Sequence, residues 1–361
     1  MERLHLGGQT THRADDGGAM KENNPHLHAA MQAVATACHV TRAVQERLQE
    51  VTALTKDDRS PVTVADYAAQ AIVALTLHDL LGNPADHLIV GEEDAAGLAG
   101  DDSKIVRQAV VETVQHWRSG ITEEQVLEAI DSCNHDGSAD AYWTLDPVDG
   151  TKGFLRGQQY AIALGRIEDG RVVNGVMGCP ALPISQDAPL DVPDPDGVLY
   201  AAALGEGAWE FSGCDPEARP LRIGARAGQD GRPWRFCGSV EKAHSNRNDT
   251  DRVADEVGNV GEPVRLDSQC KYAMVARGQA DGYLRLPTRA GYVEKIWDHA
   301  AGSIIATEGG ALVSDIHGRP LDFGCGGLLE RNRGVICATP DVHASIIGAI
   351  RTLGIDAESA S

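Results

Sequence analysis

The sequence predicts a layered fold of α/β and α+β character, built as two packed domains. At 361 residues the chain exceeds the roughly 100–200 residues of a usual single domain. Stretches with helical spacing of apolar residues alternate along it with short apolar runs that end at glycine or proline. Hydrophobic residues make up 42% and charged residues 24%, which is typical of chains that fold.

The first half is expected to open with helices and continue with strands. Apolar residues recur at helical spacing over 25–55, and Thr63 with Asp66 fits a capping box before a second helix that runs to Leu81. The other elements predicted in this half are a strand over 87–91, helices over 103–118 and 122–132, a strand over 142–145, and paired strands over 159–168 and 171–179.

A stretch rich in proline and aspartate, from Pro183 to Gly197, is the candidate domain boundary or surface loop. The expected organisation is a flexible extension over 1–24, a metal-binding α+β domain over 25–185 and an α/β domain over 186–361. The elements predicted for the last domain are strands near 198–204, 207–211 and 234–238, and helices over 250–257, 268–277, 298–308 and 340–353.

The charge of the chain excludes several kinds of partner. A net charge of −21 repels phosphate backbones and anionic membranes, so neither nucleic acid nor membrane is an expected partner. No apolar run suits a signal peptide or a membrane span, and the eight cysteines show no zinc spacing, which favours reduced thiols and a cytoplasmic location. A small anionic substrate stays possible where metals or basic residues offset the acidic background.

Three acidic groups lie next to a strand end or a helix start: Glu92-Glu93, Asp146 with Asp149, and Asp298. Paired magnesium ions, about 3.5–4 Å apart, need carboxylates from several elements, because magnesium prefers hard oxygen ligands. Each group taken singly also fits an ordinary solvated turn, since the chain has 53 acidic residues, and Asp66 alone fits a helix cap. The interpretation therefore depends on their combination.

In chain order, Asp66, Gly91-Glu-Glu93, Asp146-Pro-Val-Asp-Gly-Thr151 and Trp297-Asp-His-Ala-Ala-Gly302 resemble the lithium-sensitive inositol monophosphatase superfamily. The resemblance covers roughly residues 28–355 and implies an αβαβα sandwich. Within that superfamily the chain is similar to the 3′(2′),5′-bisphosphate nucleotidases. The runs that carry this closer likeness are Ser60–Tyr67, Thr151–Gly157, Val240–Ser245, Leu266–Tyr272 and Tyr283–Pro287.

The resemblance also implies roles for individual residues. About two or three Mg²⁺ ions would be held by Glu92, Asp146, the backbone carbonyl of Val148, Asp149 and Asp298. Asp66 would orient the Thr151 hydroxyl, which helps to activate a water for in-line attack on phosphorus. The implied substrate contacts are Thr151, His244, Ser268, Lys271, Arg285 and Asp298.

The implied activity is magnesium-dependent hydrolysis of the 3′-phosphate of adenosine 3′,5′-bisphosphate to AMP and phosphate, in sulfur assimilation. Adenosine 5′-phosphosulfate 3′-phosphate is a second candidate substrate, and the enzyme would be a lithium-sensitive monomer or weak dimer. Two alternatives stay open. One is an inositol monophosphatase or inositol polyphosphate 1-phosphatase, although Lys152-Gly-Phe154 disfavours the monophosphatase; the other is a non-catalytic nucleotide sensor, which the intact Asp66 and Thr151 disfavour.

Overall fold

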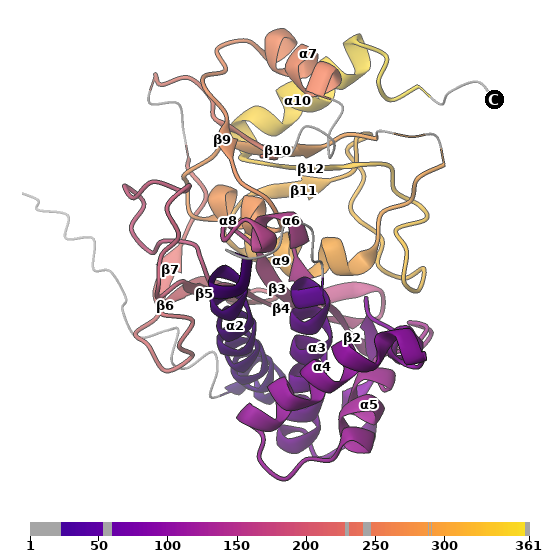
Figure 1. Ribbon diagram of the computed structural model, residues 1–361. Coiled ribbons are helices and arrows are strands. Elements are labelled where there is room, and N and C mark those ends of the chain that lie inside the picture. Colours follow the sequence, from indigo (N-terminus) through magenta and orange to yellow (C-terminus); the bar gives the residue numbers. More distant parts are fainter. Residues whose placement is uncertain are drawn as a thin grey trace, which may run out of the picture.

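The computed structural model describes residues 23–52, 60–227, 231–240, 247–287, 289 and 291–357. The described elements stack in five layers: helices, a sheet, helices, a second sheet and helices (Figure 1). This order of layers confirms the predicted α/β and α+β sandwich. None of the described helices is both long and apolar enough to cross a membrane. All eight cysteines are free thiols.

The first sheet follows the order of the chain. Its strands, within the described residues, are β1 (Ile89–Gly91), β2 (Ala141–Asp149), β3 (Ala161–Glu168), β4 (Arg171–Cys179), β5 (Val198–Ala203), β6 (Gly207–Ser212) and β7 (Leu221–Ile223). β1 and β2 run parallel, and the later neighbours are antiparallel. Both faces are covered: along β5, Leu199 and Ala201 enter one apolar core, while Val198 and Tyr200 enter another.

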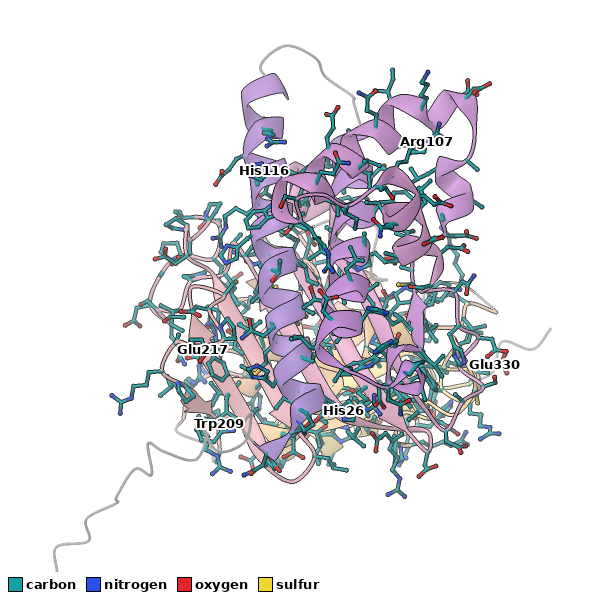
Figure 2. All side chains as sticks on the ribbon, turned by 90° about the horizontal axis from the view of Figure 1, so that it is seen from below. His26, Arg107, His116, Trp209, Glu217 and Glu330 are labelled. Carbon is teal, nitrogen blue, oxygen red and sulfur yellow. The ribbon has the colours of Figure 1, made fainter. Side chains whose placement is uncertain are left out.

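Two long helices, α2 (Pro25–Thr52) and α3 (Ser60–Leu80), cover the outer face of the first sheet. Figure 2 looks onto this layer, where both helices cross the strands. Buried alanines such as Ala30, Ala33 and Ala68 let the helices pack closely against each other and the sheet. α4 (Lys104–Trp117) and α5 (Glu123–Asp131) pack on α3, and α5 begins with a Thr122–Gln125 capping box.

The middle layer consists of α8 (Cys270–Ala276) and α9 (Ala300–Glu308). Glycines on β4 let a helix approach from either side. A Cβ at Gly175 would lie 2.3 Å from Ile304 Cγ2 and 2.9 Å from Ala301 O, both on α9, whereas a Cβ at Gly178 would lie 2.2 Å from Cys38 Sγ on α2. Residues three apart on a strand face opposite sides, so β4 is held between the two helices.

The second sheet lies between the middle helices and the last helical layer. In the part of the chain that the structure describes, its order is β11 (Leu312–Ser314), β12 (Val335–Ala338), β10 (Gly282–Arg285), β8 (Phe236–Gly238) and β9 (Val264–Arg265). Cys337 and Tyr283 face the middle helices, while Ile336 and Leu284 face the core beneath α10. The outer helices are α7 (Arg247–Val257) and α10 (Pro340–Thr352).

Short elements complete the described fold. The helix α6 (Thr151–Leu155) follows β2, and the 3₁₀ turns are η1 (Pro84–His87), η2 (Ala95–Leu98), η3 (Asp101–Ser103) and η4 (Ile296–Asp298). The sequence patterns did not predict β7, β9, β10, β11 or β12, which are strands of only two to four residues.

Two local predictions are wrong. The capping box at Thr63 and Asp66 does not form, because α3 already begins at Ser60 and its second residue is a proline, which suits a first helical turn. The strand predicted over 142–145 ends too early, because β2 continues to Asp149. The register shifts between Asp146 and Asp149, and this bulge accommodates Pro147, which has no N–H for the ladder.

The strands near 198–204 and 207–211 are predicted to belong to the last domain because of their position in the chain. They are not part of the second sheet, however. They form β5 and β6 and extend the first sheet. The predicted boundary after residue 185 falls in the connection between β4 and β5, which pair as neighbouring strands. The division into two domains stays a prediction, but the sheet continues across that point.

Gly175→Ala is expected to lower the free energy of unfolding by about 1–3 kcal/mol, because the added methyl group would press on the α9 backbone. Urea denaturation measures this change. Gly348 is the control, since it lies exposed on α10 with no atom within 4 Å of an added Cβ. Gly348→Ala should raise stability by about 0.5–1 kcal/mol through helix propensity. A Gly175→Ala protein as stable as the wild type would contradict close packing of β4 on α9.

Candidate active site

The parallel pair β1 and β2 brings the first two acidic groups together. Gly91 pairs with Leu145 in the register of these strands, and the Glu92 N–H donates to the Leu145 carbonyl at 3.2 Å. Glu92 therefore follows β1 beside Asp146 on β2. Three residues after Asp146, Asp149 ends β2. Because parallel strands end at the same edge, residues more than fifty positions apart share one site.

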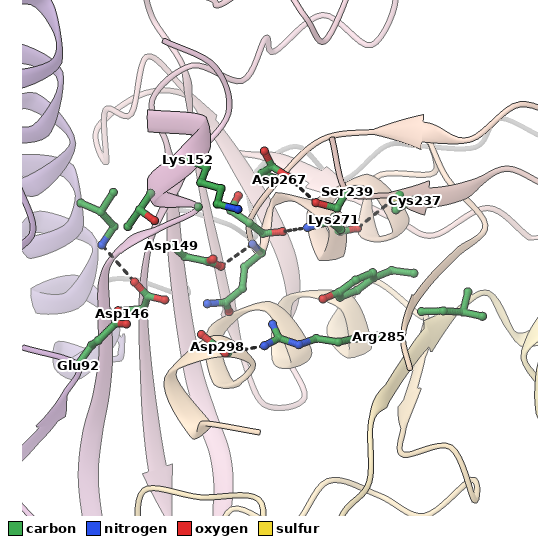
Figure 3. Close-up of a pocket in the computed structure, with 18 of the residues that line it drawn as sticks. Glu92, Asp146, Asp149, Lys152, Cys237, Ser239, Asp267, Lys271, Arg285 and Asp298 are labelled. Carbon is green, nitrogen blue, oxygen red and sulfur yellow. Dashed lines mark hydrogen bonds and ion pairs between the residues drawn. The ribbon is translucent and has the colours of Figure 1, made fainter. Parts of the chain in front are cut away.

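The second sheet supplies the opposite wall. β8 and β10 are also parallel, and their carboxyl ends carry Ser239 and Arg285. A cavity of about 370 Å³ lies between the ends of the two sheets (Figure 3). The predicted site residues that line this cavity are Glu92, Asp146, Val148, Asp149, Thr151, Ser268, Lys271, Arg285 and Asp298.

Two predicted site residues are not among the residues lining the cavity. Asp66, on α3, is only 7% exposed, and its Oδ1 atom has no hydrogen-bond partner within the described part of the chain. No hydrogen bond between described residues joins Asp66 to the Thr151 hydroxyl, so the predicted pairing stays a prediction. His244 lies outside the described residues.

The turn from β2 into α6 requires glycine. Gly150 has φ 90°, in the left-handed region, and a Cβ there would lie 2.9 Å from Ser268 Cβ. Ser268 itself has φ 66°, which is uncommon for a residue with a side chain. These two turns bring Thr151, at the start of α6, and Lys271, on α8, to the same cavity.

Carboxyl groups at this site are poorly solvated and repel one another. Burial, followed by the charges of neighbouring acids, raises the pKa of Asp66 and of Asp146 well above the usual range. Glu92 keeps an exposed surface in the cavity, yet burial and then the charge of Asp298 raise its pKa to about 7. The same causes raise the pKa of Asp149 to about 6. Each shift disfavours the ionised form and favours a cation at this place.

Three basic residues line the cavity, Lys152, Lys271 and Arg285, and the last two are held by specific contacts. Lys271 is 8% exposed, and its Nζ donates to the Ser268 carbonyl at 3.0 Å. Burial lowers the pKa of Lys271, while the charges of Asp149 and Asp267 oppose that shift. Arg285 places Nη2 between two carboxylates, 2.9 Å from Glu294 Oε2 and 3.0 Å from Asp298 Oδ2. These cations give the acidic chain a local site for an anion.

Glu294, Asp298 and His299 also bring ligand atoms within 4.8 Å of one another. A cation already lies among them, because Arg285 contacts both carboxylates. His299 continues the network: its Nε2 lies 3.2 Å from Glu294 Oε2, and its Nδ1 lies 2.8 Å from the Tyr272 hydroxyl. This cluster is therefore better explained as a buried network that holds Arg285 than as a separate metal site.

Sequence reasoning missed several residues that shape the cavity. Gln70 on α3 clamps the turn after β1, because its amide accepts from the Glu93 N–H and donates to the Glu93 carbonyl. Asp267 accepts from the Ser239 hydroxyl at 2.7 Å and forms an ion pair with Arg156. Asp267 lies inside the Leu266–Tyr272 run, so its position beside Ser268 was the available signal. For Gln70 the sequence offered no such signal, because a single glutamine within a helical pattern does not indicate a contact.

The comparisons with known proteins identify the family. A sequence model of the inositol monophosphatase family matches residues 22–354. The chain belongs to this family, as its motifs suggested. Members of the family are generally metal-dependent, which agrees with the concentration of carboxylates in the cavity.

The relatives in this family indicate a particular branch. A Schizosaccharomyces pombe protein named 3′(2′),5′-bisphosphate nucleotidase is 40% identical over 333 residues, which are 89% of this chain and 93% of the relative. The Emericella nidulans protein of the same name is 39% identical over 82% of this chain and 90% of its own. An Oryza sativa protein of the same name is 38% identical over 91% of this chain and 95% of its own.

Solved structures share the fold at lower identity. Mycobacterium tuberculosis SuhB superposes with a TM-score of 0.56 at 20% identity, covering 94% of this chain and 98% of that chain. CysQ from Bacteroides thetaiotaomicron, a bacterial member of the inositol monophosphatase family, has a TM-score of 0.56 at 22% identity, with 87% and 96% covered. Identities this low establish the common fold alone.

Asp146→Asn is expected to raise the free energy of unfolding in EDTA at about pH 8. At about pH 5 this increase should be smaller. The folded-state pKa of Asp146 is raised, so its proton is bound more tightly in the folded state, and stability falls as pH rises through that range. Removing its charge also relieves the repulsion on Glu92. Thermal unfolding across this pH range measures the difference.

The control for this experiment is Asp191→Asn, which changes an exposed acid in the connection between β4 and β5. That substitution should leave the pH dependence of unfolding unchanged. If Asp146→Asn instead destabilised the metal-free protein at the higher pH, the carboxyl cluster would not be held under mutual repulsion.

Proposed function

We propose that this protein is a magnesium-dependent 3′(2′),5′-bisphosphate nucleotidase that hydrolyses the 3′-phosphate of adenosine 3′,5′-bisphosphate to AMP and phosphate. The observation that carries the proposal is one cavity lined both by carboxylates and by the cations Lys271 and Arg285. Such a cavity suits a substrate with two phosphates, one beside metals and one beside side-chain cations. The shared name of the relatives, at 38–40% identity, supports this substrate class.

The residues present fit a magnesium site. We infer that Glu92, Asp146, Asp149, Asp298 and the Val148 carbonyl hold the ions, because they offer the hard oxygen ligands that Mg²⁺ prefers. Bound Mg²⁺ would supply charge neutralisation on the phosphoryl oxygens and make a water more acidic. The raised pKa values of Glu92 and Asp149 are the structural support, since buried, mutually repelling carboxylates need a cation.

The protein's own groups would handle the proton of the attacking water. We infer that the water donates through the Thr151 hydroxyl toward Asp66, whose buried Oδ1 has no hydrogen-bond partner among the residues that the structure describes. As the water oxygen bonds to phosphorus, the bond from phosphorus to the ribose 3′-oxygen breaks. That oxygen takes a proton and leaves as the hydroxyl of AMP. Thr151 is exposed to the cavity, so a substrate phosphate can reach it.

The nucleotide would lie toward the second sheet. We infer that Lys271, Arg285 and Ser268 contact it, together with His244, which lies outside the described residues. Lys271 and Arg285 are the described members of this set with positive charge, and both line the cavity. A phosphate bound there exchanges hydration for charge-assisted hydrogen bonds.

Phosphate release from adenosine 3′,5′-bisphosphate should depend on Mg²⁺ and exceed release from inositol 1-phosphate and fructose 1,6-bisphosphate at equal concentration. The assay uses the purified full chain with Mg²⁺ and with EDTA. Adenosine 5′-phosphosulfate 3′-phosphate and inositol 1,4-bisphosphate are added as further substrates. Preferential release from an inositol phosphate would overturn the nucleotide assignment, and no release from any of them would favour a nucleotide sensor.

Lys271→Met should raise the KM for adenosine 3′,5′-bisphosphate by about 10- to 100-fold, since one charge-assisted hydrogen bond contributes about 1.5–3 kcal/mol. The KM for p-nitrophenyl phosphate, which has no nucleoside, should change much less. Lys104→Met provides the control, because Lys104 lies exposed at the start of α4. Equal changes for the two substrates would mean that Lys271 does not contact the nucleotide.

A further inference from the structure

The turn that precedes α8 contains a buried polar residue with no role in the site described so far. Gln269 is 2% exposed, although its side-chain amide has two donor hydrogens and an acceptor oxygen to satisfy. It follows Ser268, whose left-handed backbone fixes the direction of the chain at this point. A buried amide is costly unless it is hydrogen-bonded, so its partners indicate what it does.

The partners of Gln269 belong to three separate elements. Its backbone N–H donates to Asp149 Oδ2, at the end of β2, at 2.6 Å. Its side-chain Nε2 donates to the Trp297 carbonyl in η4 at 2.8 Å, and its Oε1 accepts from the Gly302 N–H in α9 at 3.1 Å. One residue thus ties the Asp149 carboxylate to the segment that carries Asp298.

The tie joins two acids from different parts of the fold. Asp149 ends β2 and Asp298 lies in η4, yet both line the same cavity. Figure 3 shows both carboxylates directed into the same cavity. The backbone around Trp297 and Gly302 must therefore be anchored if these acids are to keep one spacing with and without a cation.

We propose that Gln269 is a positioning residue that sets the spacing between Asp149 and Asp298, so that both carboxylates can bind the same metal ions. This proposal rests on the proposed function. Gln269 lines the cavity as well, and in this role it acts through the two acids.

Glutamine suits this position for reasons of chemistry and length. The Trp297 carbonyl needs a donor and the Gly302 N–H needs an acceptor, and one amide group provides both. Methionine has nearly the same shape but satisfies neither partner. Asparagine retains the amide but is one methylene shorter, so it is too short to keep both contacts from the same backbone position.

The experiment compares Gln269→Met and Gln269→Asn with the wild-type full chain. The readout without catalysis is the Mg²⁺ concentration that gives half of the maximal thermal stabilisation. The second readout is the Mg²⁺ dependence of phosphate release. Both variants should need about 10- to 100-fold more Mg²⁺, which is the usual effect of losing a residue that orients metal ligands.

Gln159→Met is the matched control. Gln159 is 3% exposed, and its Nε2 donates to the carbonyls of Ala181 at 2.9 Å and Leu190 at 3.1 Å. Its loss should lower thermal stability in EDTA about as much as the loss of Gln269, because both glutamines bond to backbone groups in the interior. The Mg²⁺ requirement of Gln159→Met should stay at the wild-type value.

The outcomes separate this proposal from the function on which it rests. If the wild type responds to Mg²⁺ but the Gln269 variants need no more of it than the wild type, Gln269 is structural only and the proposal fails alone. If Gln269→Asn matches the wild type while Gln269→Met does not, the reach of the side chain is irrelevant and the proposed geometry fails. A wild type that neither binds Mg²⁺ nor releases phosphate would overturn the proposed function as well.

Discussion

The convergence of carboxylates in one cavity is the constraint around which this molecule is organised. Glu92, Asp146, Asp149 and Asp298 line that cavity, and the raised pKa values of the first three indicate that ionisation there is unfavourable. A fold can hold such a group only if burial elsewhere offsets the cost. The apolar cores on both faces of each sheet provide that stabilisation.

Parallel strand pairs explain where the acids meet. Most neighbours in the first sheet are antiparallel, but β1 and β2 are parallel, so Glu92 and Asp146 leave the same edge. β8 and β10 repeat the arrangement in the second sheet and bring Arg285 to the opposite wall. A hairpin places successive strand ends at opposite edges, and thus could not assemble this site from strand ends alone.

Two of the cations that line the cavity are tightly held, in a chain whose net charge is −21. Lys271 is bonded to a carbonyl, and Arg285 is shared between Glu294 and Asp298. Fixed cations attract an anion without the entropic cost of ordering a flexible side chain. The fold is common to structures at 20–22% identity, whereas relatives at 38–40% identity share the nucleotidase name. The fold therefore says less about the substrate than the residues on these walls do.

The sequence by itself determined the family, the long helices and the acids of the site. Those acids belong to contiguous motifs such as Asp146–Thr151, and long helices display a period that a reader can recognise. Single residues such as Gln70 and Gln269 carry no such signal. Gln70 bonds to Glu93, whereas Gln269 bonds to Asp149, Trp297 and Gly302. All of these partners are distant from the glutamine in the chain.

Tertiary structure alone decided which strands share a sheet, where α3 begins and how Gln269 joins the ends of β2 and η4. The Pro- and Asp-rich stretch suggested a boundary, yet β5 pairs with β4 across it. Pairing depends on hydrogen bonds and packing between segments distant in the chain, and a local pattern contains no record of them. The sequence thus determined which chemical groups are available. The fold decided which of them meet, because the distance between charges that are far apart in the chain is set by tertiary packing.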